Sequence, residues 1–287
     1  MDNIKYTIET LDNINIHEGL TKEQIDSFEK KEKDCLDAFE AIPPLGDDFN
    51  TSHRNVAEET RLDRLGELID TLIKTGASNW AIRLCVTKVQ YISNSHIWGK
   101  GRQFAGIIGR LTTLKQPGLA EEVVKIALKN ISETAISGSK SSAYHILGYT
   151  TGSPEGLNNK KLAREIFQKA EIEAEDFFEF NELACSIADD DYLGDKNYAK
   201  KVFQKAENLA AVENTNTQYE SFKRFLALGQ SYGFYLGDKN LARKAFEKAE
   251  NLAQDWRDKK WLAESVADEA YLGNSVWEKQ LLQKKKK

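Results

Sequence analysis

A repeated segment constrains the fold of this chain more than any other feature. Residues 194–210, GDKNYAKKVFQKAENLA, recur 43 positions later as 237–253, GDKNLARKAFEKAENLA. A third copy, KLAREIFQKA at 161–170, lies 36 positions before the matching part of the first. One alanine position recurs even in weaker copies, as Ala81, Ala120, Ala163, Ala199 and Ala242. Self-similarity at a period of this size is typical of a helical repeat protein.

A second segment repeats in step with the first. LACSIADDDYLG at 183–194 matches LAESVADEAYLG at 262–273, at an offset of 79, which is the sum of the offsets 36 and 43. LALGQSYGFYLG at 226–237 lies between them in the same register. Because two independent segments share the same offsets, each repeat is expected to contain two structural elements.

Both elements are predicted to be α-helices, so the fold class is all-α. In the second element the apolar residues fall on one stripe of a 3.6-residue helix: Leu241, Ala242, Ala245, Phe246, Ala249, Leu252 and Ala253. Gly194 and Gly237 are suited to end the first helix in a left-handed conformation. Asp195 and Asp238 can then cap the second helix by accepting backbone N–H bonds.

These residues resemble the tetratricopeptide-repeat family and its Sel1-like relatives. The resemblance covers roughly residues 78–283 and is clearest over 157–273. It rests on Leu228-Gly229, Tyr232, Gly237-Asp238, Ala242, Phe246 and Ala249. The period of 36–43 is longer than the usual one of that family, and its closing proline is absent. The resemblance implies a right-handed α-solenoid of about five helix–turn–helix repeats, whose first helices line a concave binding face. It implies no catalytic residue.

The N-terminal portion is predicted to cap the repeats. Thr21 and Gln24 form a capping-box pattern, and Ile25, Phe28, Leu36, Phe39 and Ile42 follow at helical spacing. Pro43-Pro44 ends this helix, and a second is expected from about 54 to 74, before Gly76. Residues 1–76 are therefore interpreted as an arm and helical cap, and 77–287 as the repeat domain with a short basic tail. A separate N-terminal domain is the alternative. The first 20 residues fit either an extended arm or a short hairpin.

Charge is distributed unevenly along the chain. Residues 1–70 carry 18 acidic and 8 basic side chains, a net charge of −10, whereas 71–155 carry 10 basic and 4 acidic, a net charge of +6. This is not the uniform basic excess of a dedicated nucleic-acid binder. The chain has no apolar run of about 18 residues, no signal-peptide pattern, and three widely spaced cysteines, so a reducing cytoplasm is expected.

The sequence contains none of the common catalytic or cofactor-binding motifs. A P-loop, a dinucleotide-binding glycine pattern, a His-Glu-x-x-His motif and a Cys-x-x-Cys pair are all absent. Each of the four histidines is isolated, and Cys85 and Cys185 occupy apolar helix positions. The chain is therefore predicted to be a binding protein rather than an enzyme, without cofactor or metal.

Acidic and aromatic residues form the first candidate site. Phe177 and Phe178 belong to a segment with more aromatic surface than one helix stripe buries. Asp189, Asp190 and Asp191 lie at the predicted end of the same helix, and Asp268 and Glu269 take the matching place two repeats later. Equivalent places in stacked repeats line up, so these carboxylates would attract a basic partner. Solvation of the helix ends is the simpler interpretation, although a helix C-terminus disfavours negative charge.

A basic and aromatic segment, residues 93–104, forms the second candidate. It contains His96, Trp98, Lys100 and Arg102. An exposed tryptophan beside two cations can stack on a base while the cations hold a phosphate. A longer loop between repeats, with the tryptophan packed inside, also fits.

The leading functional hypothesis is a protein–protein interaction module that binds another protein or peptide. A more specific version is an immunity-type inhibitor that sequesters a basic toxin. The alternative is a nucleic-acid-binding repeat protein that uses the basic 71–155 stretch.

Overall fold

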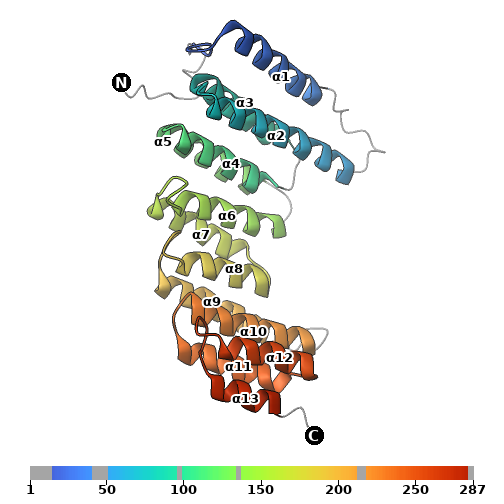
Figure 1. The fold of residues 1–287 in the computed structure, drawn as a ribbon, viewed down its shortest axis with the longest axis vertical. Helices are drawn as coiled ribbons and strands as arrows, with labels where there is room; N and C mark the ends of the chain where they lie inside the picture. The colour runs from blue at the N-terminus through green and yellow to red at the C-terminus, as the bar shows by residue number, and fades with distance from the viewer. Residues whose placement is uncertain (1–14, 41–50, 96–98, 134–136, 212–217, 284–287) are drawn as a thin grey trace. The chain divides into compact units, whose positions relative to one another are not determined.

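The computed structural model describes residues 15–40, 51–95, 99–133, 137–211 and 218–283. These residues contain thirteen α-helices and no β-strand, which confirms the all-α prediction (Figure 1). The chain divides into an N-terminal unit, Met1–Ile166, and a C-terminal unit, Phe167–Lys287. Within the described part of the chain, no helix has the length and apolar character needed to cross a membrane.

The N-terminal unit is built from helices that follow one another in chain order (Figure 1). They are α1 (Lys22–Glu40), α2 (Thr51–Lys74), α3 (Ser78–Asn94), α4 (Lys100–Thr113), α5 (Pro117–Ser132), α6 (Ser137–Gly152) and the first half of α7 (Lys160–Glu173). Helix α2 packs on α3 and α4 on α5, while α1 packs on α2. The predicted cap helices therefore belong to the same unit as the helices that follow them, and the unit boundary falls inside α7.

Local sequence signals place the first two helices. The backbone N–H of Thr21 donates to Gln24 Oε1 at 2.9 Å, and that of Gln24 donates to Thr21 Oγ1 at 3.3 Å, so the predicted capping box is present. Gly76 follows α2 with φ of +82°. Five residues of α2 are predicted from their spacing to face inward, and four of them are buried: Leu62, Leu65, Ile69 and Leu72. The fifth, Ile73, is half-buried.

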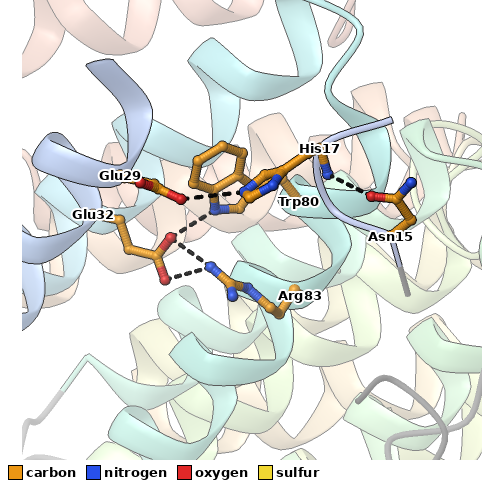
Figure 2. A network of polar contacts seen from close by, with 6 residues as sticks. All are labelled: Asn15, His17, Glu29, Glu32, Trp80 and Arg83. Carbon is orange, nitrogen blue, oxygen red and sulfur yellow. Dashed lines mark hydrogen bonds and ion pairs between the residues drawn. The ribbon is translucent and has the colours of Figure 1, made fainter. Parts of the chain in front are cut away.

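A polar network fixes α1 and the preceding turn on α3 (Figure 2). Trp80 of α3 is fully buried, and its Nε1–H donates to Glu32 Oε2 at 2.6 Å. Arg83 Nη2 donates to Glu32 Oε1 at 2.6 Å. His17 lies against the indole of Trp80, with ring centroids 5.3 Å apart, and its Nε2 is 3.4 Å from Glu29 Oε1. Residues 16–19 form a turn, while residues 1–14 lie outside the described part.

Removing the acceptor of this network should destabilise the protein. In Glu32→Ala, the buried indole N–H of Trp80 and the guanidinium of Arg83 lose their acceptor, which costs about 1–3 kcal/mol for a buried donor. Urea denaturation followed by circular dichroism measures the change. Asp26→Ala is the matched control, because this exposed carboxylate of α1 lies outside the network. Equal losses in the two variants would show that the network does not hold α1.

The C-terminal unit contains three helix pairs. After the second half of α7 come α8 (Phe177–Ala188), α9 (Lys196–Ala210), α10 (Gln218–Phe234), α11 (Lys239–Leu252), α12 (Trp256–Ala267) and α13 (Ser275–Gln283). Helix α8 packs on α9, α10 on α11 and α12 on α13. Helix α10 also contacts both α8 and α12, so the first helices of the pairs are neighbours.

The same contacts recur from one layer of this unit to the next. Lys205 Nζ is 2.8 Å from Glu171 Oε1, and Lys248 Nζ is 2.7 Å from Glu207 Oε1. The two lysines are 43 positions apart and the two glutamates 36, as in the sequence repeat. Each ammonium also lies over an aromatic ring, Phe180 at 5.5 Å and Phe225 at 5.1 Å. The sequence repeat therefore corresponds to a repeated set of three-dimensional contacts.

The predicted boundaries between paired helices are also present. Gly194 and Gly237 have φ of +72° and +65°, the left-handed region that glycine adopts without steric cost. Asp195 Oδ1 accepts the N–H of Tyr198 at 2.9 Å, and Asp238 Oδ1 accepts that of Leu241 at 3.0 Å. The hydrogen bond from Leu241 lowers the pKa of Asp238.

The register of α10 differs from the sequence alignment by two residues. The alignment placed Leu226 at the position of Leu183 and Leu262, but the fully buried leucine of α10 is Leu228. The reason is that α8 ends at Ala188 and α12 at Ala267, followed by a turn, whereas α10 continues as helix through Phe234.

Contacts between the first helices support this shifted register. Cys185 Sγ of α8 lies 3.5 Å from Ser231 Oγ of α10. In the next layer, Gln230 Nε2 of α10 donates to Ser265 Oγ of α12 at 2.9 Å. Gln230 thus corresponds to Cys185, and Ser265 to Ser231. The sequence comparison matched the segments that follow the three helices. Because α10 is longer at its C-terminal end than α8 and α12, this match places the buried residues of α10 two positions too early.

Candidate functional site

Two acidic turns lie at the ends of α8 and α12. The main-chain carbonyl of Asp189 accepts the N–H groups of the three residues 192–194, and its Oδ1 accepts the N–H of Asp191 at 2.9 Å. Asp268 repeats this arrangement, with Oδ1 accepting the N–H of Ala270 at 2.9 Å. Each carboxylate thus shapes its own turn with one oxygen. Except for the half-buried Asp189, the acidic side chains of both turns are exposed: Asp190, Asp191, Asp268 and Glu269.

Aromatic residues occupy the corresponding place between these turns. Phe234 ends α10 and is 60% exposed, and its ring meets Tyr235 edge to face at 4.9 Å. Burial raises the pKa of Tyr235, and the nearby carboxylate of Asp189 raises it further. We call residues 189–191, 234–235 and 268–269 the acid–aromatic strip. Sequence reasoning missed the two aromatic members, although GFYLG in place of DDYLG was a visible signal.

The two predicted phenylalanines of α8 have different environments. Phe177 is 1% exposed, so it lies in the core and is corrected from a partner-contact residue to a packing residue. Phe178 is 49% exposed and meets the ring of Phe177 at 5.1 Å. A helix turns by about 100° per residue, so adjacent residues cannot both face inward. Of these two residues, only Phe178 offers aromatic surface to a partner.

A pocket of about 330 Å³ lies between α10 and α12, close to the strip. Helix α10 contributes Leu226 and Gln230, and α12 with its turn contributes Trp261, Glu264, Ser265, Asp268 and Tyr271. The indole of Trp261 is 45% exposed. Positions 261, 264, 265 and 268 are spaced as one face of a helix, so an exposed ring and two carboxylates point to the same side. Apart from Asp268, these residues were not predicted as site residues.

A larger pocket of about 410 Å³ lies between α1 and α2, but its lining does not indicate the charge of a ligand. Its lining mixes both signs of charge, with three cations and two carboxylates beside the neutral thiol of Cys35: Lys31, Arg61, Arg64, Asp34 and Glu67. Burial raises the pKa of the Cys35 thiol. This mixture favours neither a cationic nor an anionic ligand.

The second predicted site falls partly outside the described residues, which exclude His96 and Trp98. Lys100 begins α4 and is half-buried, and its Nζ lies 3.4 Å from the carbonyl of Ser93. Burial lowers the pKa of Lys100. Arg102 is exposed. Of this site, only Arg102 presents a free-standing cation on the described surface.

The acidic N-terminal stretch compensates part of the basic stretch in three dimensions. Arg83 pairs with Glu32 of α1, and Arg110 Nε and Nη2 each donate to Asp70 of α2 at 2.7 Å. The bidentate pair holds the pKa of Asp70 below its ordinary value. The net charge of +6 counted over 71–155 therefore overstates the positive charge that faces solvent.

Lys88 is a buried cation beside this pair. It is 2% exposed, and within the described residues its ammonium makes no hydrogen bond or ion pair. Burial lowers its pKa to about 8, and Arg110 contributes by repulsion. Gly66 of α2 makes this arrangement possible, because a Cβ there would lie 3.0 Å from both Lys88 Nζ and Arg110 Nη2.

We expect Lys88 to make the free energy of unfolding depend on pH in the alkaline range. The folded protein releases this proton near pH 8, whereas the unfolded chain keeps it to about 10.5. Because the unfolded state binds more protons in that interval, Lys88 should add roughly 3 kcal/mol to the free energy of unfolding as pH rises. The buried thiols of Cys85 and Cys185, whose pKa values are raised, act in the opposite direction above about pH 9, so the Lys88 contribution is measured as a difference between variants. In urea titrations at several pH values, the difference in the free energy of unfolding between Lys88→Met and the parent should change by this amount, whereas Lys125→Met, which changes an exposed lysine, should follow the parent at every pH. An unchanged pH dependence in Lys88→Met would assign the effect to another group.

Cys85 and Cys185 are protonated at neutral pH. Burial raises the pKa of Cys85 to about 12 and that of Cys185 to about 11. A thiol in this state is a poor nucleophile and a poor metal ligand. Among the residues that the structure describes, no group of three or more His, Cys, Asp and Glu side chains is placed to hold a metal ion.

Comparison with known proteins gives no relative from which a function can be transferred. No protein-family profile, no curated protein and no solved structure matches this chain.

Proposed function

We propose that this chain is a non-catalytic protein-interaction module of the tetratricopeptide-like kind, and that the acid–aromatic strip binds a basic protein or peptide. The observation that carries the proposal is the alignment of the strip within one unit: carboxylates at the ends of α8 and α12 flank the exposed Phe234 at the end of α10. Complementary charge brings a partner to such a surface, and aromatic residues supply contact area.

The helical layers suit this role. A solenoid of about five helix–turn–helix repeats presents its first helices side by side, and α8, α10 and α12 are neighbours of that type. Asp189 and Asp268 shape their turns. A basic partner accounts better than helix stability for the exposed carboxylates of Asp191 and Glu269, because a helix C-terminus disfavours nearby negative charge. Sequestration of a basic toxin in the cytoplasm is a specific form of this proposal.

The nucleic-acid alternative has less support. It requires the cations of 71–155, of which Arg83 and Arg110 pair with acidic residues and Lys88 is buried. Exposed cations such as Arg102 and Lys125 remain available for it.

Site-specific photo-crosslinking in the native cytosol tests the proposal. A photoreactive residue at Phe178 or Phe234 should capture a basic protein, insensitive to nuclease, and capture should fall as salt is raised. The same residue at Arg102 is the matched control. Capture of nucleic acid at Arg102, with no protein captured at Phe178 or Phe234, would reverse the assignment.

A further inference from the structure

We infer that the pocket between α10 and α12 receives one arginine side chain of the basic partner, and this inference rests on the proposed function. The pocket volume of about 330 Å³ is at the small end for ligand sites, which suits a single side chain. Its wall combines the three groups that a guanidinium requires: an exposed aromatic face, carboxylates and an apolar surface for the aliphatic stem.

The aromatic and acidic groups come from one face of α12. Trp261 presents an exposed indole, on which a planar guanidinium can stack. Glu264 and Asp268 follow at the spacing of successive helical turns, so both carboxylates can pair with the same cation. Arginine is favoured over lysine because it stacks and donates two parallel hydrogen bonds at once.

The opposite wall comes from α10. Leu226 supplies an apolar surface for the methylene groups of the incoming side chain. The Gln230 amide donates to Ser265 Oγ at 2.9 Å, which connects the two helices across the base of the pocket.

The ring and the carboxylate of this pocket are specific to α12. In the register set by the repeated contacts, Ala227 and Gln230 of α10 hold the positions of Trp261 and Glu264. The preceding layer therefore lacks both the ring and the carboxylate. The competing cation is Lys260, whose Nζ lies 3.7 Å from Glu264 Oε1 on the surface, a weak exposed pair.

An NMR titration tests the inference directly. The full chain is labelled with ¹⁵N at its tryptophan indoles, and Trp261→Phe identifies the Trp261 signal. The probes are acetyl-Gly-Arg-Gly-amide, its lysine analogue, and its citrulline analogue, which has nearly the same shape without the charge. We expect a saturable shift of the Trp261 signal with the arginine peptide, at least tenfold weaker binding of the citrulline peptide, and intermediate binding of the lysine peptide.

Variants separate the pocket from general electrostatics. Glu264→Gln should weaken arginine binding at least fivefold, and Lys260→Gln should strengthen it by releasing the carboxylate. Glu247→Gln, an exposed change on α11, is the matched control and should have no such effect. Equal shifts with arginine and citrulline, or arginine binding unchanged in Glu264→Gln, would overturn the inference. If the arginine peptide fails to bind while neutralisation of residues 189–191, which lie outside the pocket, still slows partner association, the proposed function stands and the pocket assignment falls. The reverse result retains the pocket and removes the wider strip.

Discussion

Neutralising the acidic members of the strip is expected to slow partner association at least tenfold while leaving the fold intact. The variant replaces residues 189, 190, 191 and 268 with Asn and 269 with Gln, which removes five negative charges at nearly constant shape. Charge complementarity raises association rates by roughly 10- to 1000-fold, so its removal should act mainly on the rate of association.

The structure explains why the fold should survive these changes. Asp189 and Asp268 each shape their turn with one side-chain oxygen, and Asn retains an oxygen that accepts the same N–H bond. The other three side chains are exposed. The melting temperature should therefore hold or rise, since like charges near helix C-termini are removed.

Stopped-flow or surface-binding kinetics with the captured partner measure the effect. The parent should also associate more slowly as salt increases. Arg102→Gln with Lys125→Gln is the matched control, because it removes exposed charge of the opposite sign from the basic stretch. If this control abolishes binding and the neutralised strip binds normally, the basic stretch is the functional surface.

Truncating the core aromatic rings of α9 and α11 should produce the largest loss of stability. Phe203 and Phe246 are fully buried, and Phe203 contacts the ring of Tyr232 with centroids 5.3 Å apart. Phe203→Ala and Phe246→Ala should each cost roughly 3–5 kcal/mol through lost burial and an unfilled cavity. Ala199→Leu should cost about 1–3 kcal/mol, because the fully buried alanine leaves no room for a larger side chain.

A double-mutant cycle tests whether the ring of Phe246 packs against Gly229 of α10. A Cβ at Gly229 of α10 would collide with the ring of Phe246, so Gly229→Ala should destabilise the parent. In the Phe246→Ala background the collision is absent, and the added cost should become small. Urea denaturation by circular dichroism and tryptophan fluorescence measures all variants. If Phe203→Ala, Phe246→Ala and Ala199→Leu all unfold like the parent, the buried helix stripe has been assigned wrongly.

Short-range signals in the sequence were sufficient to predict the helical class of the repeated segments and several of the helix ends. The capping box at Thr21 and Gln24 and the caps at Asp195 and Asp238 are formed by residues within three positions of each other, so they depend little on the rest of the fold. The buried stripe was predictable for a similar reason, because the period of 3.6 residues fixes which positions share a helix face.

Tertiary structure alone decided the features that depend on neighbouring helices. The acidic turns were predicted at helix ends, but the exposed Phe234 between them follows from the longer α10, whose register packing sets through Leu228. The separation of Phe177 from Phe178 depends on the face that α8 buries, and the pocket of Trp261 depends on the approach of α10 to α12. The exposed charge of the basic stretch was decided in the same way: Arg83 pairs with Glu32 51 positions away and Arg110 with Asp70 40 positions away, distances at which the local pattern of a sequence carries no information about contact.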